Sequence, residues 1–234
     1  MKLAIMQPYF FPYIGYFQLI NAVDKFVIYD NIEYTKKGWI NRNRILMNGN
    51  DFLFSIPLKK DSDFLNISQR SLAENFPEHK KKIIGQVNSA YSKSPNFNFA
   101  FPIIEECINF GDMNLFGFIF NSIKRICQYL DIKTEFILSS TLNIDPNSKG
   151  ENKVVAINKE LGSSVYINAI GGLELYSKDL FLQNQIELKF LQTHSISYKQ
   201  FENEFVPNLS IIDVLMFNST GRIKEYLQSF YTLV

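Results

Sequence analysis

Four basic side chains lie close together between residues 36 and 44 of the sequence: Lys36, Lys37, Arg42 and Arg44. On a strand, a period of two places Arg42 and Arg44 on one face, with Cα atoms roughly 6.5–7 Å apart. The other face would then carry Trp39, Asn41 and Asn43. Guanidinium forks bind phosphate oxygens in a bidentate manner, whereas Lys37 would add a point charge. The cluster therefore suits a diphosphate, and an exposed strand face of alternating charge is the alternative.

Trp39 is the only tryptophan of the chain, and its ring suits two roles. It can stack on the base or sugar of a ligand held by the arginines, or it can cover the hydrophobic core. We include Trp39 and the amide of Asn41 among the candidate substrate-binding residues, and core packing is the alternative for the indole.

His194 is the candidate general base. It follows the end of a predicted strand, whereas the other histidine, His79, lies at the lysine-rich start of a predicted helix. Imidazole titrates near neutral pH and can take a proton from an amine or a hydroxyl group. Tyr198 or an acid such as Asp30 would orient it, and a surface or hydrogen-bonded loop histidine is the alternative.

A loop rich in proline and aromatic rings follows the first apolar strand. Pro8 ends that strand, an amphipathic segment covers 16–23, and a second apolar strand covers 26–29. The resulting βαβ unit brings the carboxyl ends of both strands to one edge of the sheet, where ligands of open α/β sheets bind. We therefore expect Gln7, Tyr9 and Asp30 to meet there, with Tyr9 and Asp30 as catalytic candidates and Gln7 and Tyr16 as binding candidates.

Two further features have a functional and a structural interpretation. Gly171 and Gly172 follow a predicted strand, and their backbone N–H groups could form an anion-binding nest, although a plain strand-to-helix turn explains them equally well. Ser210 is a good N-cap, and Asp213 stands at the capping-box position of the next predicted helix, which accounts for its carboxylate without a catalytic role.

The remaining pattern predicts an α/β fold, with a mostly parallel sheet flanked by helices in a Rossmann-like three-layer arrangement. An Asn48–Gly49 turn between alternating segments predicts a β-hairpin near residues 39–58, and helical spacing predicts three helices over 77–130. Further strands are predicted at 134–138, 165–167 and 186–191, and further helices at 149–161, 210–218 and 222–230. We expect one domain over 1–234, with a helical insertion at about 71–130.

Composition excludes several classes of protein. With 24 basic and 23 acidic residues the net charge is +1, which disfavours binding to nucleic acid. No apolar run is long enough to insert into a membrane or to form a signal sequence, so we expect a cytoplasmic protein. Cys107 and Cys127 have neither a second pair nor neighbouring histidines, which favours buried free thiols and indicates no metal site.

Three unusual motifs, together with the pair Asp30-Asn31, resemble the WbqC-like family, and the match runs nearly end to end. They are the Gln7–Phe17 stretch Gln-Pro-Tyr-Phe-Phe-Pro-Tyr-Ile-Gly-Tyr-Phe, the Lys36–Ile45 stretch Lys-Lys-Gly-Trp-Ile-Asn-Arg-Asn-Arg-Ile, and Phe205-x-Pro207-x-Leu209-Ser210-Ile211-Ile212-Asp213. Many relatives have His-Gln-Pro where this chain has Met6-Gln7-Pro8, so no histidine role at position 6 carries over.

The resemblance implies a place in the assembly of O-antigen and related surface polysaccharides, with a suggested glycine-transferase role. The substrate expected from it is a nucleotide-linked amino sugar, and forming an amide with a free amino acid implies ATP or an activated acyl donor. Two alternatives stay open. One is a nucleotidyl- or glycosyltransferase of the same pathway, with a divalent metal on Asp30 and Glu33, and the other is a non-catalytic module that binds sugar or nucleotide.

Overall fold

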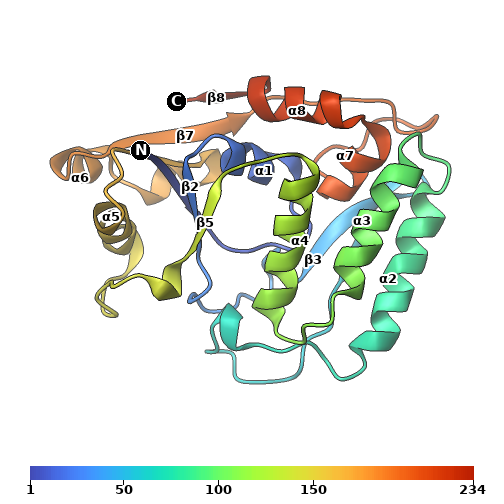
Figure 1. Ribbon diagram of the computed structural model, residues 1–234, viewed down its shortest axis with the longest axis horizontal. Coiled ribbons are helices and arrows are strands. Elements are labelled where there is room, and N and C mark those ends of the chain that lie inside the picture. Colours follow the sequence, from blue (N-terminus) through green and yellow to red (C-terminus); the bar gives the residue numbers. More distant parts are fainter.

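The computed structural model describes residues 1–234 and contains a six-stranded sheet with helices on both faces (Figure 1). The strand order is β5-β2-β1-β6-β7-β8, in which only the β7–β8 pair is antiparallel. The strands are β1 (Lys2–Met6), β2 (Lys25–Ile28), β5 (Glu135–Leu138), β6 (Val165–Ala169), β7 (Glu187–Thr193) and β8 (Tyr231–Leu233). The expected α/β fold with a mostly parallel sheet is therefore confirmed.

The alternation of side chains along the strands builds two hydrophobic layers. On β1, Ala4 faces a core of 44 buried residues, while Leu3 and Ile5 face a second core of 11 buried residues. The larger core holds α1 (Ile14–Asn21), α7 (Ile211–Phe217) and α8 (Thr220–Ser229), and the smaller one holds α5 (Gly150–Glu160) and α6 (Lys178–Gln183). Figure 1 shows these two groups on opposite sides of the sheet, which is the expected three-layer arrangement.

The hairpin and three long helices lie between β2 and β5 in the sequence. The hairpin consists of β3 (Arg42–Met47) and β4 (Asn50–Ser55), and it forms a separate two-stranded sheet. Its turn residues have positive φ angles, 52° at Asn48 and 77° at Gly49, as a tight two-residue turn requires. The helices are α2 (Phe76–Tyr91), α3 (Phe97–Asn109) and α4 (Leu115–Tyr129), and their buried side chains belong to the larger core. The division into one domain with a helical insertion stays a prediction.

Some elements were not expected from the sequence. They are the short 3₁₀ helices η1 (Ile67–Gln69), η2 (Ser139–Thr141) and η3 (Ile170–Leu175), the six-residue helix α6 and the edge strand β8. All are too short for hydrophobic periodicity to develop, and β8 has only three residues, two of them exposed. The hairpin strands are also shorter than expected, because β3 begins at Arg42 and leaves Trp39 in the preceding turn.

The order of the strands creates a topological switch point beside β1. From β1 the chain winds outward through β2 to β5, and then returns through α5 to place β6 on the other side of β1. The connections that follow β1 and β6 therefore leave in opposite directions. A crevice opens at such a point at the carboxyl ends of the strands, where ligands of open α/β sheets bind.

The two ends of the chain meet on one face of the sheet. The buried Gln18 side chain on α1 donates to the carbonyls of Tyr226 and Phe230 at 2.8 and 3.0 Å, and accepts a hydrogen bond from Thr193 Oγ1 at 2.7 Å. This amide joins α1 to α8 and to the end of β7. No helix of the protein combines the length and apolar character needed to cross a membrane.

Both cysteines are buried free thiols, and we predict that neither reacts in the native state. Burial raises the pKa of Cys107 to about 12 and raises the pKa of Cys127 further still. Because the thiolate is the reactive form, a disulfide reagent at mildly alkaline pH should modify neither residue in the folded protein and both in concentrated guanidinium chloride. Absorbance of the released thiol measures this, and rapid native labelling would contradict the buried placement.

Candidate functional site

A crevice of about 530 Å³ lies at the switch point, as the topology requires. Its walls come from the end of β1, the end of β6, the turn η3 and the start of α5. We call it the switch-point crevice, and its polar lining residues are Gln7, Tyr9, Tyr29, Glu151, Asn168 and Tyr176. Four of the predicted site residues, Gln7, Tyr9, Gly171 and Gly172, therefore lie in one place.

A second cavity, of about 330 Å³, adjoins this crevice at Tyr9. We call it the aromatic pocket, and it is lined by Tyr9, Pro12, Tyr13, Trp39, Asn43, Arg44 and Asn208. Three aromatic rings and one guanidinium suit a ligand that combines a ring with an anionic group. Tyr9 forms a wall of both cavities, and burial raises the pKa of its hydroxyl group.

A third cavity, of about 370 Å³, contains His194, and we call it the histidine pocket. It shares Tyr13 and Asn208 with the aromatic pocket. The His194 side chain is exposed, and it has no protein hydrogen-bond partner. Tyr198 lines the same pocket, but its hydroxyl group donates to Asp213 at 2.6 Å, and Asp30 accepts from Ser139 at 2.9 Å. Neither expected orienting residue therefore forms a hydrogen bond with the His194 side chain, and the base role stays a prediction.

The loop between β1 and α1 presents both shared tyrosines, and two side chains from distant segments fix its backbone. Asn43 on β3 donates through Nδ2 to the carbonyls of Phe10 and Phe11, at 3.1 and 2.7 Å. Ser210, the N-cap of α7, donates to the same Phe11 carbonyl at 2.7 Å. Phe11 has a φ of 43°, a conformation that costs a bulky residue on the order of 1–3 kcal/mol. The hydrogen bonds maintain this strained shape.

Gly15 determines where the ring of Tyr13 lies. A Cβ atom at position 15 would come within 2.4 Å of the Tyr13 ring, so only glycine permits this approach. The ring folds over the first turn of α1, and the same side chain lines the aromatic pocket and the histidine pocket. Gly15 thereby sets the wall between the two cavities.

The two arginines do not form the open pair that strand periodicity predicts. Arg42 donates to the carbonyls of Lys37 and Gly38, and therefore holds the turn that carries Trp39. Arg44 pairs with Asp51 at 2.9 Å and lines the aromatic pocket. Both guanidiniums lie over the Trp39 ring, at 5.6 and 4.9 Å from its centre. The expectation that Trp39 occupies the opposite face or covers the core is wrong, because Trp39 precedes the strand and is 40% exposed.

Asp30 reaches the expected edge of the sheet but faces away from the cavities. Ile28 pairs with Met6, so Asp30 and Gln7 follow neighbouring strand ends. The Asp30 carboxylate is buried and accepts hydrogen bonds from Ser139 Oγ and the Ser140 N–H group, both at 2.9 Å. It lines none of the three cavities. These hydrogen bonds connect the residue after β2 to η2, the turn that follows β5.

Other expected binding residues have local structural partners. Tyr16 is buried and donates to the Gln7 carbonyl at 2.9 Å, which fixes the end of β1. Lys37 is exposed and lines none of the three cavities. Asn41 accepts a hydrogen bond from Tyr34 at 2.8 Å and lies in a different cavity, described below. Neither Gly171 nor Gly172 has a positive φ, so these residues of η3 form no left-handed nest.

Asp213 is buried at the centre of a polar network rather than in a helix cap. Its carboxylate accepts hydrogen bonds from Tyr91 at 2.9 Å, Tyr198 at 2.6 Å and Gln200 at 2.7 Å. Tyr91 in turn accepts from the Leu46 N–H group of β3 at 2.8 Å. The network joins the hairpin, α2 and the segment after β7, whose Tyr198 lines the histidine pocket.

Sequence reasoning missed several lining residues, some of which lie in its motifs. Tyr13, Asn43 and Asn208 fall inside the three stretches quoted above, whereas Asn168 and Tyr176 do not. Asn208 could have been identified as a lining residue because it lies between Pro207 and Leu209 of the third motif. No local pattern identifies Asn168 or Tyr176, because they reach the crevice through the β1–β6 pairing and the turn η3.

Fold and site together define a three-layer α/β protein with a cleft of adjoining cavities at its topological switch point. More narrowly, the chain belongs to the WbqC-like protein family, whose model matches residues 7–225. It is similar to Uncharacterized protein Rv1507c of Mycobacterium tuberculosis, with 26% identity over 234 residues that cover 97% of each chain. No solved structure shows a significant match to the chain.

Asp213 gives a pH-dependent prediction for stability. Burial raises the pKa of this carboxyl group from 3.8 in the folded protein, although the Tyr198, Gln200 and Tyr91 hydrogen bonds lower it. The folded state therefore holds the proton more tightly than the unfolded chain, and the contribution of Asp213 to stability falls as pH rises from 3.8 through its folded pKa. We predict that Asp213→Asn removes this part of the pH dependence.

The measurement is urea denaturation at several pH values. The free energy of unfolding of the wild type minus that of Asp213→Asn should decrease as pH rises across this window. Asp51→Asn is the matched control, because Asp51 is an exposed partner in an ion pair and should leave the slope nearly unchanged. A difference that stays constant with pH would show that Asp213 has an ordinary pKa.

Proposed function

We propose that this chain is a cytoplasmic transferase of surface-polysaccharide assembly that joins an acyl group, such as glycine, to a nucleotide-linked amino sugar. The observation that carries the proposal is the Tyr9 wall shared by the switch-point crevice and the aromatic pocket. Two adjoining cavities with one common wall suit a reaction in which two substrates must meet. Membership in the WbqC-like family supports the same class of function.

The aromatic pocket suits the nucleotide-linked sugar. Rings of Tyr13 and Trp39 offer apolar faces for a base or a sugar, and the Asn208 amide can recognise hydroxyl groups. Arg44 is the one cation in the lining, and its ion pair with Asp51 is exposed and weak, so the guanidinium can turn toward a phosphate at little cost. Arg42 does not line this pocket, but its hydrogen bonds to the Lys37 and Gly38 carbonyls hold the turn that carries Trp39.

The switch-point crevice suits the activated acyl donor. Amide formation needs a carboxyl group with a good leaving group, which ATP or an aminoacyl donor would supply. Gly150 and Glu151 at the start of α5 line this crevice, and Gln7 and Asn168 offer amide hydrogen bonds. The amine of the sugar would attack the donor carboxyl carbon beside Tyr9, and the leaving group would depart with the electron pair of the broken bond.

His194 suits the removal of the proton from the attacking amine. Its imidazole is exposed in the histidine pocket, which adjoins the aromatic pocket through Tyr13 and Asn208, and no protein group occupies its nitrogen atoms. An amine that attacks a carboxyl carbon must lose a proton, and a neutral imidazole accepts it near physiological pH.

A metal-dependent nucleotidyl- or glycosyltransferase has less support. The carboxylate of Asp30 is buried and bonded to Ser139 and Ser140, whereas Glu33 is exposed. A module that binds sugar or nucleotide without catalysis uses the same aromatic pocket, so measurements on His194 must separate it from a transferase.

Arg44→Ala should weaken binding of the nucleotide-linked sugar about 10-fold or more, because a charge-assisted hydrogen bond contributes about 1.5–3 kcal/mol. Stability should change by less than about 1 kcal/mol. Thermal-shift screening of UDP-, GDP-, CDP- and dTDP-linked sugars identifies the ligand, since a compound at about 100 times its Kd adds about 2.7 kcal/mol. Calorimetry then compares the wild type with the variant.

Arg125→Ala is the matched control for this measurement, because Arg125 also forms an exposed ion pair, with Glu106, away from the three cavities. It should bind as the wild type does. Equal affinities of Arg44→Ala and Arg125→Ala for the sugar nucleotide would show that its phosphate does not bind in the aromatic pocket.

His194→Gln should reduce turnover by about 100-fold or more and leave the affinity for the sugar nearly unchanged, because general base catalysis contributes on the order of 10²–10⁴-fold in rate. Transfer of labelled glycine to the sugar found in the screen, with ATP present, measures turnover. His79→Gln is the control, because His79 lies on α2 and lines none of the three cavities. Equal turnover of the two variants would contradict the base role, and binding without any turnover in the wild type would favour the binding module.

A further inference from the structure

A cavity of about 740 Å³ lies outside the candidate site and shares no lining residue with its three cavities. We call it the Arg70 pocket. It lies between the segment before β3, the end of β4 with the following loop, and the residue after η1. Its charged lining residues are Lys36, Lys59, Lys60, Asp61, Asp63 and Arg70. Four cationic side chains against two carboxylates leave two positive charges.

Arg70 is the unusual member of this set. Its side chain is buried, with only 4% of the residue exposed, and yet no carboxylate forms an ion pair with it. Nη2 donates to the Ser62 carbonyl at 2.7 Å, while the buried Nε has no hydrogen-bond partner. The guanidinium lies over the Tyr34 ring, 4.5 Å from its centre. A buried cation without a counter-ion is costly, which points to a missing anionic partner.

The backbone around Arg70 is firmly fixed. Its N–H group donates to the Ile67 carbonyl at 3.2 Å, and its carbonyl accepts from the Leu115 N–H group at the start of α4 at 2.9 Å. The Asn66 and Gln69 side chains form a capping box on η1, immediately before it. Because these contacts fix the position of Arg70, the guanidinium belongs to a built cavity and not to a loose surface.

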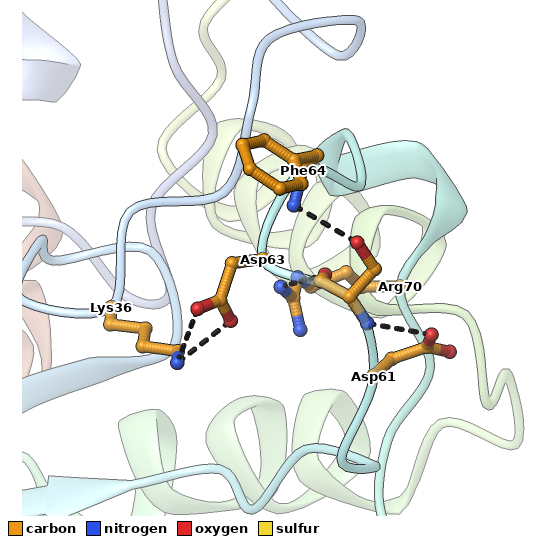
Figure 2. A network of polar contacts seen from close by, with 6 residues as sticks. Lys36, Asp61, Asp63, Phe64 and Arg70 are labelled. Carbon is orange, nitrogen blue, oxygen red and sulfur yellow. Dashed lines mark hydrogen bonds and ion pairs between the residues drawn. The ribbon is translucent and has the colours of Figure 1, made fainter.

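The nearest carboxylate is already engaged by a lysine. Figure 2 shows Asp63 between Lys36 and Arg70, with both dashed lines from the Asp63 carboxylate running to Lys36. Lys36 Nζ lies 2.7 Å from Asp63 Oδ1, and both side chains are more than half exposed, so solvent screening makes this ion pair weak. Lys36 can therefore turn toward an incoming anion at little cost.

We propose that the Arg70 pocket binds a phosphate group of a small molecule. The two excess positive charges match the charge of about −1.5 to −2 on a phosphate monoester at neutral pH. The Arg70 guanidinium, which lines the pocket, and the ammonium groups of Lys59 and Lys60 are the donors that would face its oxygens. A simple carboxylate would leave one of these two charges uncompensated. The proposal does not depend on the proposed transferase function.

Calorimetry at low salt with inorganic phosphate and with pyrophosphate tests this site. The wild type should bind pyrophosphate in a saturable manner, and the double variant Lys59→Met, Lys60→Met should bind it at least 10-fold more weakly. Lys199→Met is the control, because Lys199 is an exposed lysine paired with Glu202 outside the pocket. Absence of saturable binding to the wild type, or equal affinity in the double variant and the control, would overturn the proposal.

A second readout locates the anion at the buried guanidinium. In ¹⁵N-resolved NMR spectra the Arg70 Nε–H resonance, assigned through its loss in Arg70→Lys, should shift during the titration. Arg44→Ala should keep this shift, since Arg44 lines a different cavity. A shift that vanishes in Arg44→Ala, or an Arg70 resonance that never moves, would assign the bound phosphate to the aromatic pocket and reject the Arg70 site. This result does not require Arg70→Lys to bind or to be fully stable.

Discussion

The candidate site depends on the hydrogen bonds that Asn43 donates to the carbonyls of Phe10 and Phe11. These two residues lie between Tyr9 and Tyr13, which line all three cavities between them. The left-handed conformation of Phe11 is unfavourable for its residue type, so the loop needs partners outside itself to maintain it. Asn43 supplies them from the hairpin, and Ser210 adds a third bond from the start of α7.

This dependence explains why a hairpin that does not extend the main sheet still matters to the site. Its strand β3 carries Asn43 and Arg44 to the aromatic pocket, and Leu46 of the same strand donates to Tyr91 in the Asp213 network. Asp213 is the only carboxylate in that network, and burial raises its pKa, so its charge is kept at a cost. The network also fixes Tyr198 in the histidine pocket. Burial of the Asp213 carboxylate thus lowers the stability of the protein, while the hydrogen bonds of the network fix the geometry around the cavities.

Local patterns predicted most of the fold and about half of the site. The Asn48–Gly49 turn, the helical spacing in α2–α4 and the apolar strands are encoded over short windows, and the structure contains all of them. Gln7, Tyr9 and His194 were found because they follow strand ends. Arg42 and Arg44 share one face of β3 as period two predicts, but backbone carbonyls of the Trp39 turn occupy the Arg42 guanidinium and Asp51 pairs with Arg44. Asn168 and the buried Arg70 depend on long-range contacts that no local pattern contains.

The position of β1 has a consequence for the order in which the molecule is built. One edge of this central strand pairs with β2 soon after it in the sequence, but the other edge waits for β6, whose first residue is Val165. Gln18 likewise finds its carbonyl partners only at Tyr226 and Phe230. During synthesis the first strand must therefore keep an apolar, unpaired edge exposed until most of the chain has been made. The loop between β1 and α1 must also wait, because Ser210, which donates to its Phe11 carbonyl, is made after β6 and β7.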